Sequence, residues 1–181
     1  MAEVILVTGG ARSGKSALAL QLTDGYAPRV FIATAEAFDD EMRERIARHR
    51  AERGPGWDTI EAPLDLAGAI RRAGAPGAAV LVDCLTVWLG NRLHHEPALA
   101  EDGAFPAELD AAIRESQAAR LVLVTNEVGM GIVPENELAR RFRDLAGRLN
   151  QRVAALANRV ILSVCGQALT IKDAPGKENA R

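Results

Sequence analysis

The stretch Gly9-Gly10-Ala11-Arg12-Ser13-Gly14-Lys15-Ser16 decides the fold, because it fits the pattern G-x-x-x-x-G-K-[ST] of a phosphate-binding P-loop. In this pattern the glycines bring backbone N–H groups close to phosphate oxygens, the lysine reaches the β- and γ-phosphates, and the serine hydroxyl binds Mg²⁺. An apolar run at 4–8 precedes the loop, and a helical pattern follows it at 15–23. This strand-to-helix setting favours a true P-loop over a chance glycine-rich turn.

Further along the chain, short apolar runs alternate with helical patterns. The runs are rich in Val, Ile and Leu without polar alternation, which is typical of strands buried on both faces of a parallel sheet. The expected strands span residues 4–8, 29–34, 79–83, 121–125 and 159–164. The expected helices span residues 15–23, 40–53, 64–73, 85–95, 107–119 and 137–156. This order predicts an α/β fold with a doubly wound, mostly parallel sheet and helices on both of its faces.

Length and composition fit one globular domain over residues 1–181, with a loose tail at 173–181. The chain is 48% hydrophobic and 25% charged, and its formal net charge is −2. This charge gives no electrostatic case for nucleic-acid binding, and no apolar run reaches the ~18 residues of a membrane span. No signal peptide is recognised, so we expect a cytoplasmic, reduced protein. Its two cysteines, Cys84 and Cys165, lack metal-site spacing and are expected to be buried thiols.

In a doubly wound sheet the ligand lies beyond the carboxyl ends of the strands. The residues there are the P-loop, Ala33-Thr34-Ala35, Asp83 and Thr125-Asn126-Glu127. Asp83 closes the run Ala79-Val80-Leu81-Val82 and resembles a Walker B aspartate, whose carboxylate helps to hold Mg²⁺. The alternative is an aspartate that caps the following helix.

The expected helix 40–53 carries acids at its start and arginines near its end. Met42, Ile46 and His49 share one face of it, so His49 is directed toward the protein. Neighbouring arginines disfavour the imidazolium, which leaves a neutral ring available as a base or nucleophile. Considered alone, however, His49 is better explained as a half-buried helix histidine. In the helix 137–156 an apolar stripe predicts core or subunit packing.

Several segments together resemble one family, the bifunctional adenosylcobinamide kinase / adenosylcobinamide-phosphate guanylyltransferases of cobalamin biosynthesis. The similarity follows the chain in order from the first strand almost to its end, and the most specific part is residues 125–151. The matching segments are the P-loop, Ile32-Ala33-Thr34-Ala35, Asp39-Asp40-Glu41-Met42 with Arg45, Ile46 and His49, Thr125-Asn126-Glu127-Val128-Gly129-Met130-Gly131-Ile132-Val133-Pro134-Glu135, and Arg141-Phe142-Arg143-Asp144-Leu145-Ala146-Gly147-Arg148-Leu149-Asn150-Gln151.

The resemblance implies a RecA-like P-loop fold, a homotrimer and two reactions. ATP or GTP phosphorylates adenosylcobinamide, and GTP then donates GMP to adenosylcobinamide phosphate through a guanylylated histidine, releasing pyrophosphate. His49 falls at the position of that histidine, and Lys15 is the P-loop lysine. The nucleotide contacts that the resemblance implies are Gly9, Gly10, Ala11, Arg12, Ser13, Gly14, Lys15, Ser16, Ala33, Thr34, Ala35, Arg50, Ala51, Glu52, Arg53, Glu61 and Asp83. Ser16 and Asp83 are the expected Mg²⁺ ligands.

Two other functions remain open at this stage. A simple P-loop kinase would need Lys15, Ser16 and Asp83 but not His49. A nucleotide-dependent switch or assembly ATPase would use hydrolysis to drive a protein partner, with 125–134 as its switch loop. Consumption of nucleotide that a corrinoid stimulates would separate an enzyme from a switch, and a histidine-bound nucleotide would exclude the simple kinase.

Overall fold

The computed structural model describes residues 2–37, 40–99, 105 and 107–174; within the helix Asp40–Arg53 it describes the side chains of residues 40, 43, 44, 47, 50, 51 and 53. Its centre is a seven-stranded sheet with the strand order β3-β2-β4-β5-β1-β6-β7. Strands β1 to β6 are parallel to their neighbours, and β7 is antiparallel to β6. The strands are β1 (Glu3–Thr8), β2 (Arg29–Ala33), β3 (Asp58–Glu61), β4 (Ala79–Asp83), β5 (Arg120–Val124), β6 (Arg159–Val164) and β7 (Gln167–Asp173).

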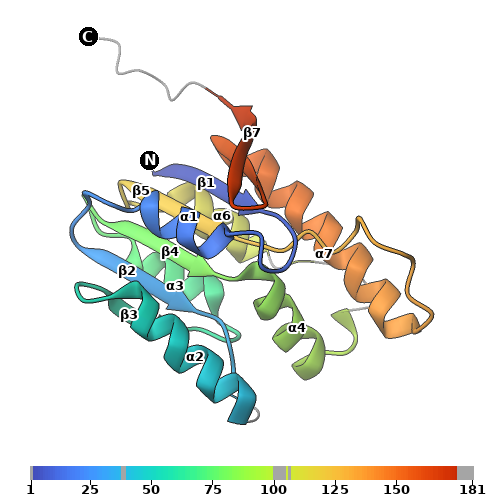
Figure 1. Cartoon of the computed structure of the whole chain (residues 1–181). Coiled ribbons are helices and arrows are strands. Elements are labelled where there is room, and N and C mark those ends of the chain that lie inside the picture. The colour runs from blue at the N-terminus through green and yellow to red at the C-terminus, as the bar shows by residue number, and fades with distance from the viewer. Residues whose placement is uncertain (1, 38–39, 100–104, 106, 175–181) are drawn as a thin grey trace.

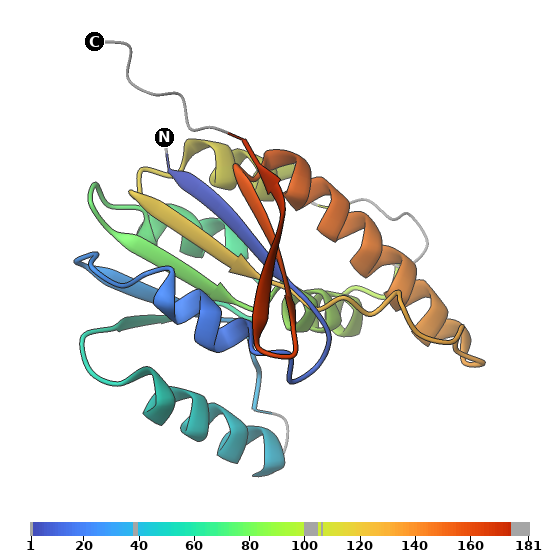
Figure 2. The same cartoon turned by 45° about the horizontal axis from the view of Figure 1, so that its top comes forward.

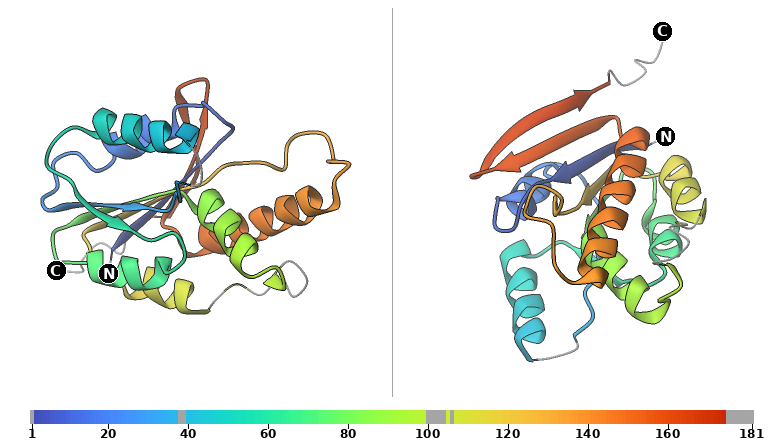
Figure 3. Two further views of the ribbon diagram at one scale, coloured as in Figure 1. Left: turned by 90° about the horizontal axis from the view of Figure 1, so that it is seen from below. Right: turned by 90° about the vertical axis from the view of Figure 1, so that its right-hand side faces the viewer.

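Helices cover both faces of this sheet, as predicted (Figures 1 and 2). The helices α3, α4, α6 and α7 pack on one face, whereas α1 lies on the other, and the view from below separates the two layers (Figure 3). The helices are α1 (Lys15–Gln21), α2 (Asp40–Arg53), α3 (Leu66–Ala73), α4 (Leu85–His95), α6 (Ala107–Glu115) and α7 (Glu137–Leu156). Within the described residues, no helix is long and apolar enough to cross a membrane.

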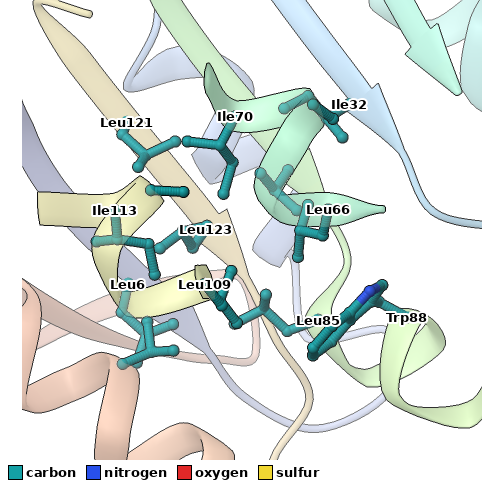
Figure 4. Packing of buried hydrophobic residues seen from close by; sticks show 14 of the residues in the cluster. Leu6, Ile32, Leu66, Ile70, Leu85, Trp88, Leu109, Ile113, Leu121 and Leu123 are labelled. Atoms are coloured by element: carbon teal, nitrogen blue, oxygen red, sulfur yellow. The ribbon is translucent and has the colours of Figure 1, made fainter. Parts of the chain in front are cut away.

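The larger core lies between the sheet and the four helices on its first face. Leu6 and Leu123 of the sheet, Ile70 of α3, Leu85 of α4 and Ile113 of α6 meet there, each at most 1% exposed (Figure 4). A smaller cluster under α1 contains Ile5, Val122 and Val124. Neighbouring residues of β1 and β5 thus point to opposite faces, which explains why these strands read as continuous apolar runs.

Two strands were missing from the sequence prediction, and both lie at an edge of the sheet. β3 is polar and mostly exposed, with the sequence Asp58-Thr59-Ile60-Glu61. β7 is exposed on both of its faces, and it places Asp173 in a strand where a loose tail was expected. Neither strand has the apolar run by which a buried strand is recognised. The Ala174 N–H donates to the Asn158 carbonyl oxygen at 2.8 Å, and residues 175–181 of the expected tail lie outside the described residues.

Of two smaller expectations, the first needs correction and the second is met by the core only in part. Cys84 is buried as predicted, but Cys165 is exposed, because it lies in the tight turn between β6 and β7 and has a φ of 53°. In α7 the expected apolar stripe is buried at Leu145, Leu149 and Val153, whereas Leu138 at its start is 61% exposed. The first turn of α7 therefore extends beyond the core.

Candidate active site

The P-loop connects β1 to α1 at the carboxyl edge of the sheet. Gly9 and Gly14 have φ values of 150° and 97°, which side chains other than glycine rarely allow, and Arg12 is left-handed at 55°. α1 begins at Lys15, directly after Gly14. The positions of the glycines in the motif are therefore explained by the backbone of the turn.

A contact from the far end of the chain holds this loop. Ser163 of β6 donates from Oγ to the Ser13 carbonyl oxygen at 2.7 Å, and the Gly166 N–H donates to the same oxygen at 2.9 Å. A Cβ placed on Gly9 would lie 2.3 Å from the Ser163 carbonyl oxygen. The end of β6 and the turn that follows it thus contact the P-loop directly. The sequence analysis did not predict this contact.

Lys15 is buried within the loop, with 7% of its surface exposed. Its Nζ donates to the Gly10 carbonyl oxygen at 2.5 Å and to Ser13 Oγ at 3.5 Å. Burial lowers the pKa of Lys15, and Cys84 and Asp83 oppose that shift. The site thus holds a poorly solvated cation that a phosphate would neutralise.

Ser16 and Asp83 meet as the sequence predicts. Ser16 Oγ donates to Asp83 Oδ2 at 3.2 Å, and Asp83 is the last residue of β4. The first position before α4 is Cys84, so the alternative of Asp83 as that helix's cap does not hold. Hydroxyl and carboxylate oxygens are the donors that Mg²⁺ prefers, and phosphates and water commonly complete its shell. Among the described residues no cluster of three or more His, Cys, Asp or Glu forms a metal cage.

Three predicted residues lie level with one another on adjacent strands. Ala33 of β2 pairs in register with both Glu61 of β3 and Asp83 of β4. Thr34 follows Ala33 and is fully buried; its Oγ1 donates to the Cys84 carbonyl oxygen at 2.9 Å and accepts from the Cys84 N–H at 2.8 Å. Thr34 therefore fixes the backbone next to Asp83. Burial, with a smaller effect of Asp83, raises the pKa of Cys84 to about 11.

Arg53, the last residue of α2, lies beside Ser16 and Asp83 and borders the same cavity. Arg53 stacks over the Phe31 ring at 3.7 Å from its centroid, and burial followed by the charge of Arg50 lowers the pKa of Arg53. Arg50 pairs with Glu61 at 2.6 Å on the surface. A cavity of about 230 Å³ lies between α1 and Arg53, and Ser16 and Asp83 border it. Of the two arginines expected at the nucleotide, Arg53 thus borders the same cavity as Ser16 and Asp83, whereas Arg50 is not among its lining residues.

The remaining predicted residues are placed only in part. His49 and Glu52 lie in α2, where the helix was expected, but their side chains are outside the described residues. Ala51 is exposed in the same helix, and Ala35 follows Thr34 in the loop after β2. A larger cavity of about 320 Å³, lined in part by Trp88 and Arg92, contains no predicted site residue.

A buried polar network, which the sequence analysis did not identify, organises the same edge of the sheet. Thr125 Oγ1 lies 3.2 Å from Thr86 Oγ1 and donates to Asn150 Oδ1 at 2.7 Å. The Asn126 N–H donates to Thr86 Oγ1 at 2.7 Å, and its carbonyl oxygen accepts from Asn150 Nδ2 at 3.1 Å. Side chains of α4 and α7 therefore fix the backbone that follows β5.

These features define a P-loop NTPase with a RecA-like fold. The solved structure of the assembled ATPase EscN of the enteropathogenic E. coli type III secretion system is similar, with a TM-score of 0.55 and 12% identity. The match covers 91% of this chain and 43% of that chain, and at this identity it shows the fold alone. A family model described as cobinamide kinase / cobinamide phosphate guanyltransferase matches residues 5–171, and the chain belongs to this family.

Curated relatives agree with that assignment over nearly their whole length. The bifunctional adenosylcobalamin biosynthesis protein CobU of Salmonella typhimurium is 46% identical over 181 residues, covering 93% of this chain and 99% of its own. The CobU protein of Escherichia coli is 45% identical over 180 residues, with the same coverage. The bifunctional adenosylcobalamin biosynthesis protein CobP of Pseudomonas aeruginosa is 44% identical over 171 residues, covering 94% of this chain and 98% of its own.

Proposed function

We propose that this chain catalyses two successive reactions of cobalamin biosynthesis. It first phosphorylates the hydroxyl of adenosylcobinamide with ATP or GTP, and it then transfers GMP from GTP to adenosylcobinamide phosphate. The observation that carries the proposal is the contact between Ser16 and Asp83 beside a buried P-loop lysine, in a chain that matches the family model over residues 5–171. The two alternatives, a simple kinase and a switch ATPase, each account for only part of this combination.

In the kinase step the substrate hydroxyl oxygen attacks the γ-phosphorus. A new O–P bond forms, the bond between that phosphorus and the β,γ-bridging oxygen breaks, and the nucleoside diphosphate leaves while the hydroxyl proton passes to solvent. The catalytic contribution of the chain is positioning and charge stabilisation by the P-loop N–H groups and Lys15. Because burial disfavours an uncompensated Lys15 cation, its attraction to phosphate is stronger than that of an exposed lysine.

In the second step we propose that a neutral His49 attacks the α-phosphorus of GTP. An N–P bond forms, the bond to the α,β-bridging oxygen breaks, and pyrophosphate leaves. A phosphate oxygen of adenosylcobinamide phosphate then attacks the same phosphorus, breaking the N–P bond and restoring the histidine. His49 precedes Arg53 by about one helical turn, and Arg53 borders the cavity beside Ser16. A covalent intermediate divides one difficult transfer into two easier ones.

The remaining predicted contacts complete the proposed site. Mg²⁺ held by Ser16 and Asp83 would neutralise phosphate charge. Arg53 supplies positive charge at the cavity, Arg50 precedes it by three residues in α2, and Glu61 is level with Asp83 across β2. The backbone at Ala33, Thr34 and Ala35, the P-loop residues and the α2 segment 50–53 form the nucleotide contacts of this proposal.

We further propose that the protein acts in the cytoplasm as a homotrimer, with small molecules as its substrates. Support for self-association comes from large apolar side chains that lie exposed at the loop before α7 and at its first turn. These are Met130, Ile132, Val133 and Leu138. An exposed patch of this kind commonly marks an interaction surface.

The direct test incubates the protein with Mg²⁺, adenosylcobinamide and nucleotide labelled at the γ-phosphate, followed by GTP labelled at the α-phosphate. We expect γ-label in the corrinoid product of the first reaction and α-label in that of the second. Lys15→Ala should lose both, because the same loop serves both steps. Label in inorganic phosphate alone, with no corrinoid product, would contradict the proposal and favour a switch ATPase.

A further inference from the structure

The carboxyl end of β5 lies between the two halves of the proposed site. β5 pairs with β1, which leads into the P-loop, and with β4, which ends in Asp83. Beyond β5 the chain continues along the P-loop, because the Thr125 N–H donates to the Val7 carbonyl oxygen at 2.9 Å and the Glu127 N–H donates to the Gly9 carbonyl oxygen at 3.0 Å. Asn126 therefore lies between Lys15 of the P-loop and Asp83 in the order of the strands.

The alternation of side chains along β5 assigns Asn126 to a face of the sheet. Val124 packs in the cluster under α1, whereas Thr125 contacts Thr86 and Asn150 on the opposite face. β5 itself ends at Val124, but the hydrogen bonds of the Thr125 and Glu127 N–H groups to Val7 and Gly9 continue the pairing with β1 beyond that point. We infer that the alternation of side chains continues with it, which assigns Asn126 to the face of α1. Asp83 projects to that face too, since it contacts Ser16, and it pairs in register with Val124. Asn126, two residues after Val124, therefore lies on the same face as Asp83 and just beyond it in the direction of the strands.

The backbone of Asn126 is held by hydrogen bonds, whereas no described residue hydrogen-bonds its side chain. Thr86 accepts its N–H and Asn150 donates to its carbonyl oxygen, at 2.7 and 3.1 Å. The half-buried side-chain amide has no hydrogen-bond partner among the residues that the structure describes. A half-buried amide on an immobilised backbone keeps its N–H groups available to a ligand, and this arrangement is typical of a preorganised donor.

We propose that the side-chain amide of Asn126 is a catalytic contact to the transferring phosphoryl group. Its Nδ2 donates to a non-bridging γ-phosphate oxygen as the acceptor oxygen bonds to the phosphorus and the β,γ-bridging oxygen leaves. Thr86 and Asn150 are positioning residues that act through the Asn126 backbone. This inference rests on the proposed kinase step and adds to it a neutral donor between the P-loop and Asp83. Such a donor stabilises charge that develops during transfer.

The test compares Asn126→Ala and Asn126→Asp with the wild type, using nucleotide labelled at the γ-phosphate. We expect Asn126→Ala to lower kcat for corrinoid phosphorylation about 100-fold, while the Kd for nucleotide changes less than about threefold. Asn126→Asp should lower kcat further, because a carboxylate of the same shape cannot donate and repels phosphate. Asn158→Ala is the matched control: Asn158 Oδ1 accepts the Val4 N–H at 2.8 Å at the opposite edge of the sheet, and its loss should leave kcat unchanged.

Each outcome bears separately on the two proposals. A kcat within about threefold of the wild type in Asn126→Ala would overturn the inference, and so would an Asn126→Asp variant more active than Asn126→Ala, which indicates a structural role. The slow transfer of γ-phosphate to water gives a second measurement that needs no corrinoid. If the wild type phosphorylates only water, the proposed function fails; a hydrolysis rate that is about 100-fold lower in Asn126→Ala would still support the role of Asn126.

Discussion

Ser163 Oγ donates a hydrogen bond of 2.7 Å to the carbonyl oxygen of Ser13, although 150 positions separate the two residues in the chain. Ser163 is 1% exposed, and the next contact to the same oxygen comes from the N–H of Gly166 in the turn after β6. The shape of the P-loop therefore depends on a hairpin at the other end of the sequence. Stability of the hairpin and affinity for nucleotide should be linked.

Ser163→Ala is expected to weaken nucleotide binding without unfolding the protein. The Gly166 N–H still holds the Ser13 carbonyl, so we expect a loss of about 1 kcal/mol in the free energy of unfolding and a Kd for GTP raised about 5- to 10-fold. Thermal unfolding and GTP titration measure the two effects. Ser116→Ala, another buried serine, serves as the control and should lower stability without changing the Kd. An unchanged Kd in Ser163→Ala would show that the hairpin does not shape the loop.

Gly9→Ala should abolish nucleotide binding. The added Cβ would lie 2.3 Å from the Ser163 carbonyl oxygen, and the φ of 150° already strains an alanine. We expect destabilisation of about 2 kcal/mol or more and no binding that GTP titration detects. Gly147→Ala in α7 is the contrasting variant: its Cβ would meet nothing within 4 Å, so alanine should stabilise the helix by about 0.5–1 kcal/mol. A Gly9→Ala protein that binds GTP normally would contradict this account of the loop.

Lys15→Met should stabilise the protein in the absence of nucleotide and remove the stabilisation that nucleotide binding produces. Burial lowers the pKa of Lys15, so the folded chain releases this proton at a lower pH than the unfolded chain does. The unfavourable contribution of the cation therefore diminishes as the pH rises toward 10.5, and methionine removes it at every pH.

We expect Lys15→Met to raise the Tm by about 3 °C, the equivalent of about 1 kcal/mol, and to abolish the additional rise that GTP produces. Lys172→Met is the control, because Lys172 Nζ binds the Ala154 carbonyl oxygen at 2.9 Å at the end of α7. That variant should keep the response to GTP. A lower Tm in Lys15→Met would show that the buried cation stabilises the fold.

The two cysteines should differ sharply in reactivity. Cys165 is exposed, whereas burial raises the pKa of Cys84 to about 11, which keeps it a thiol at neutral pH. At pH 8 a thiol reagent should modify one group rapidly in the native chain and both in the denatured chain. The Cys165→Ser variant should show no rapid reaction while folded. Two rapid reactions in the native protein would mean that Cys84 is accessible.

The sequence was sufficient to predict the centre of the fold. Both 79–83 and 159–164 are strands over their full expected length, because they are apolar runs buried in the sheet. β3 and β7 could not be recognised, since edge strands carry the polar side chains of an exposed surface. The wrong prediction that Cys165 is buried has the same cause. Cys165 is exposed in the turn between β6 and β7, and this turn forms only because β7 pairs with β6.

For the site, motif residues were easier to predict than the residues that support them. The contact between Ser16 and Asp83 could be predicted, because one belongs to the P-loop motif and the other is an acid at the end of a strand. The register of β2 and β4 explains why Ala33 lies beside Asp83. The contact of Ser163 with the P-loop depends on the register of β6 against β1, which no local pattern encodes. The sequence placed Asn126 among the residues at the carboxyl ends of the strands, and only the position of β5 between β1 and β4 shows that it lies between the P-loop and Asp83.

The proposed guanylyl-histidine is tested most directly by incubating the protein with Mg²⁺ and GTP labelled at the α-phosphate. We expect label bound to the protein that is lost in acid but stable in base, the behaviour of a phosphoramidate, and none in His49→Ala. The label should pass to added adenosylcobinamide phosphate. A folded wild-type protein that binds GTP but acquires no label, or a His49→Ala variant that is labelled equally, would contradict the account and leave a simple kinase.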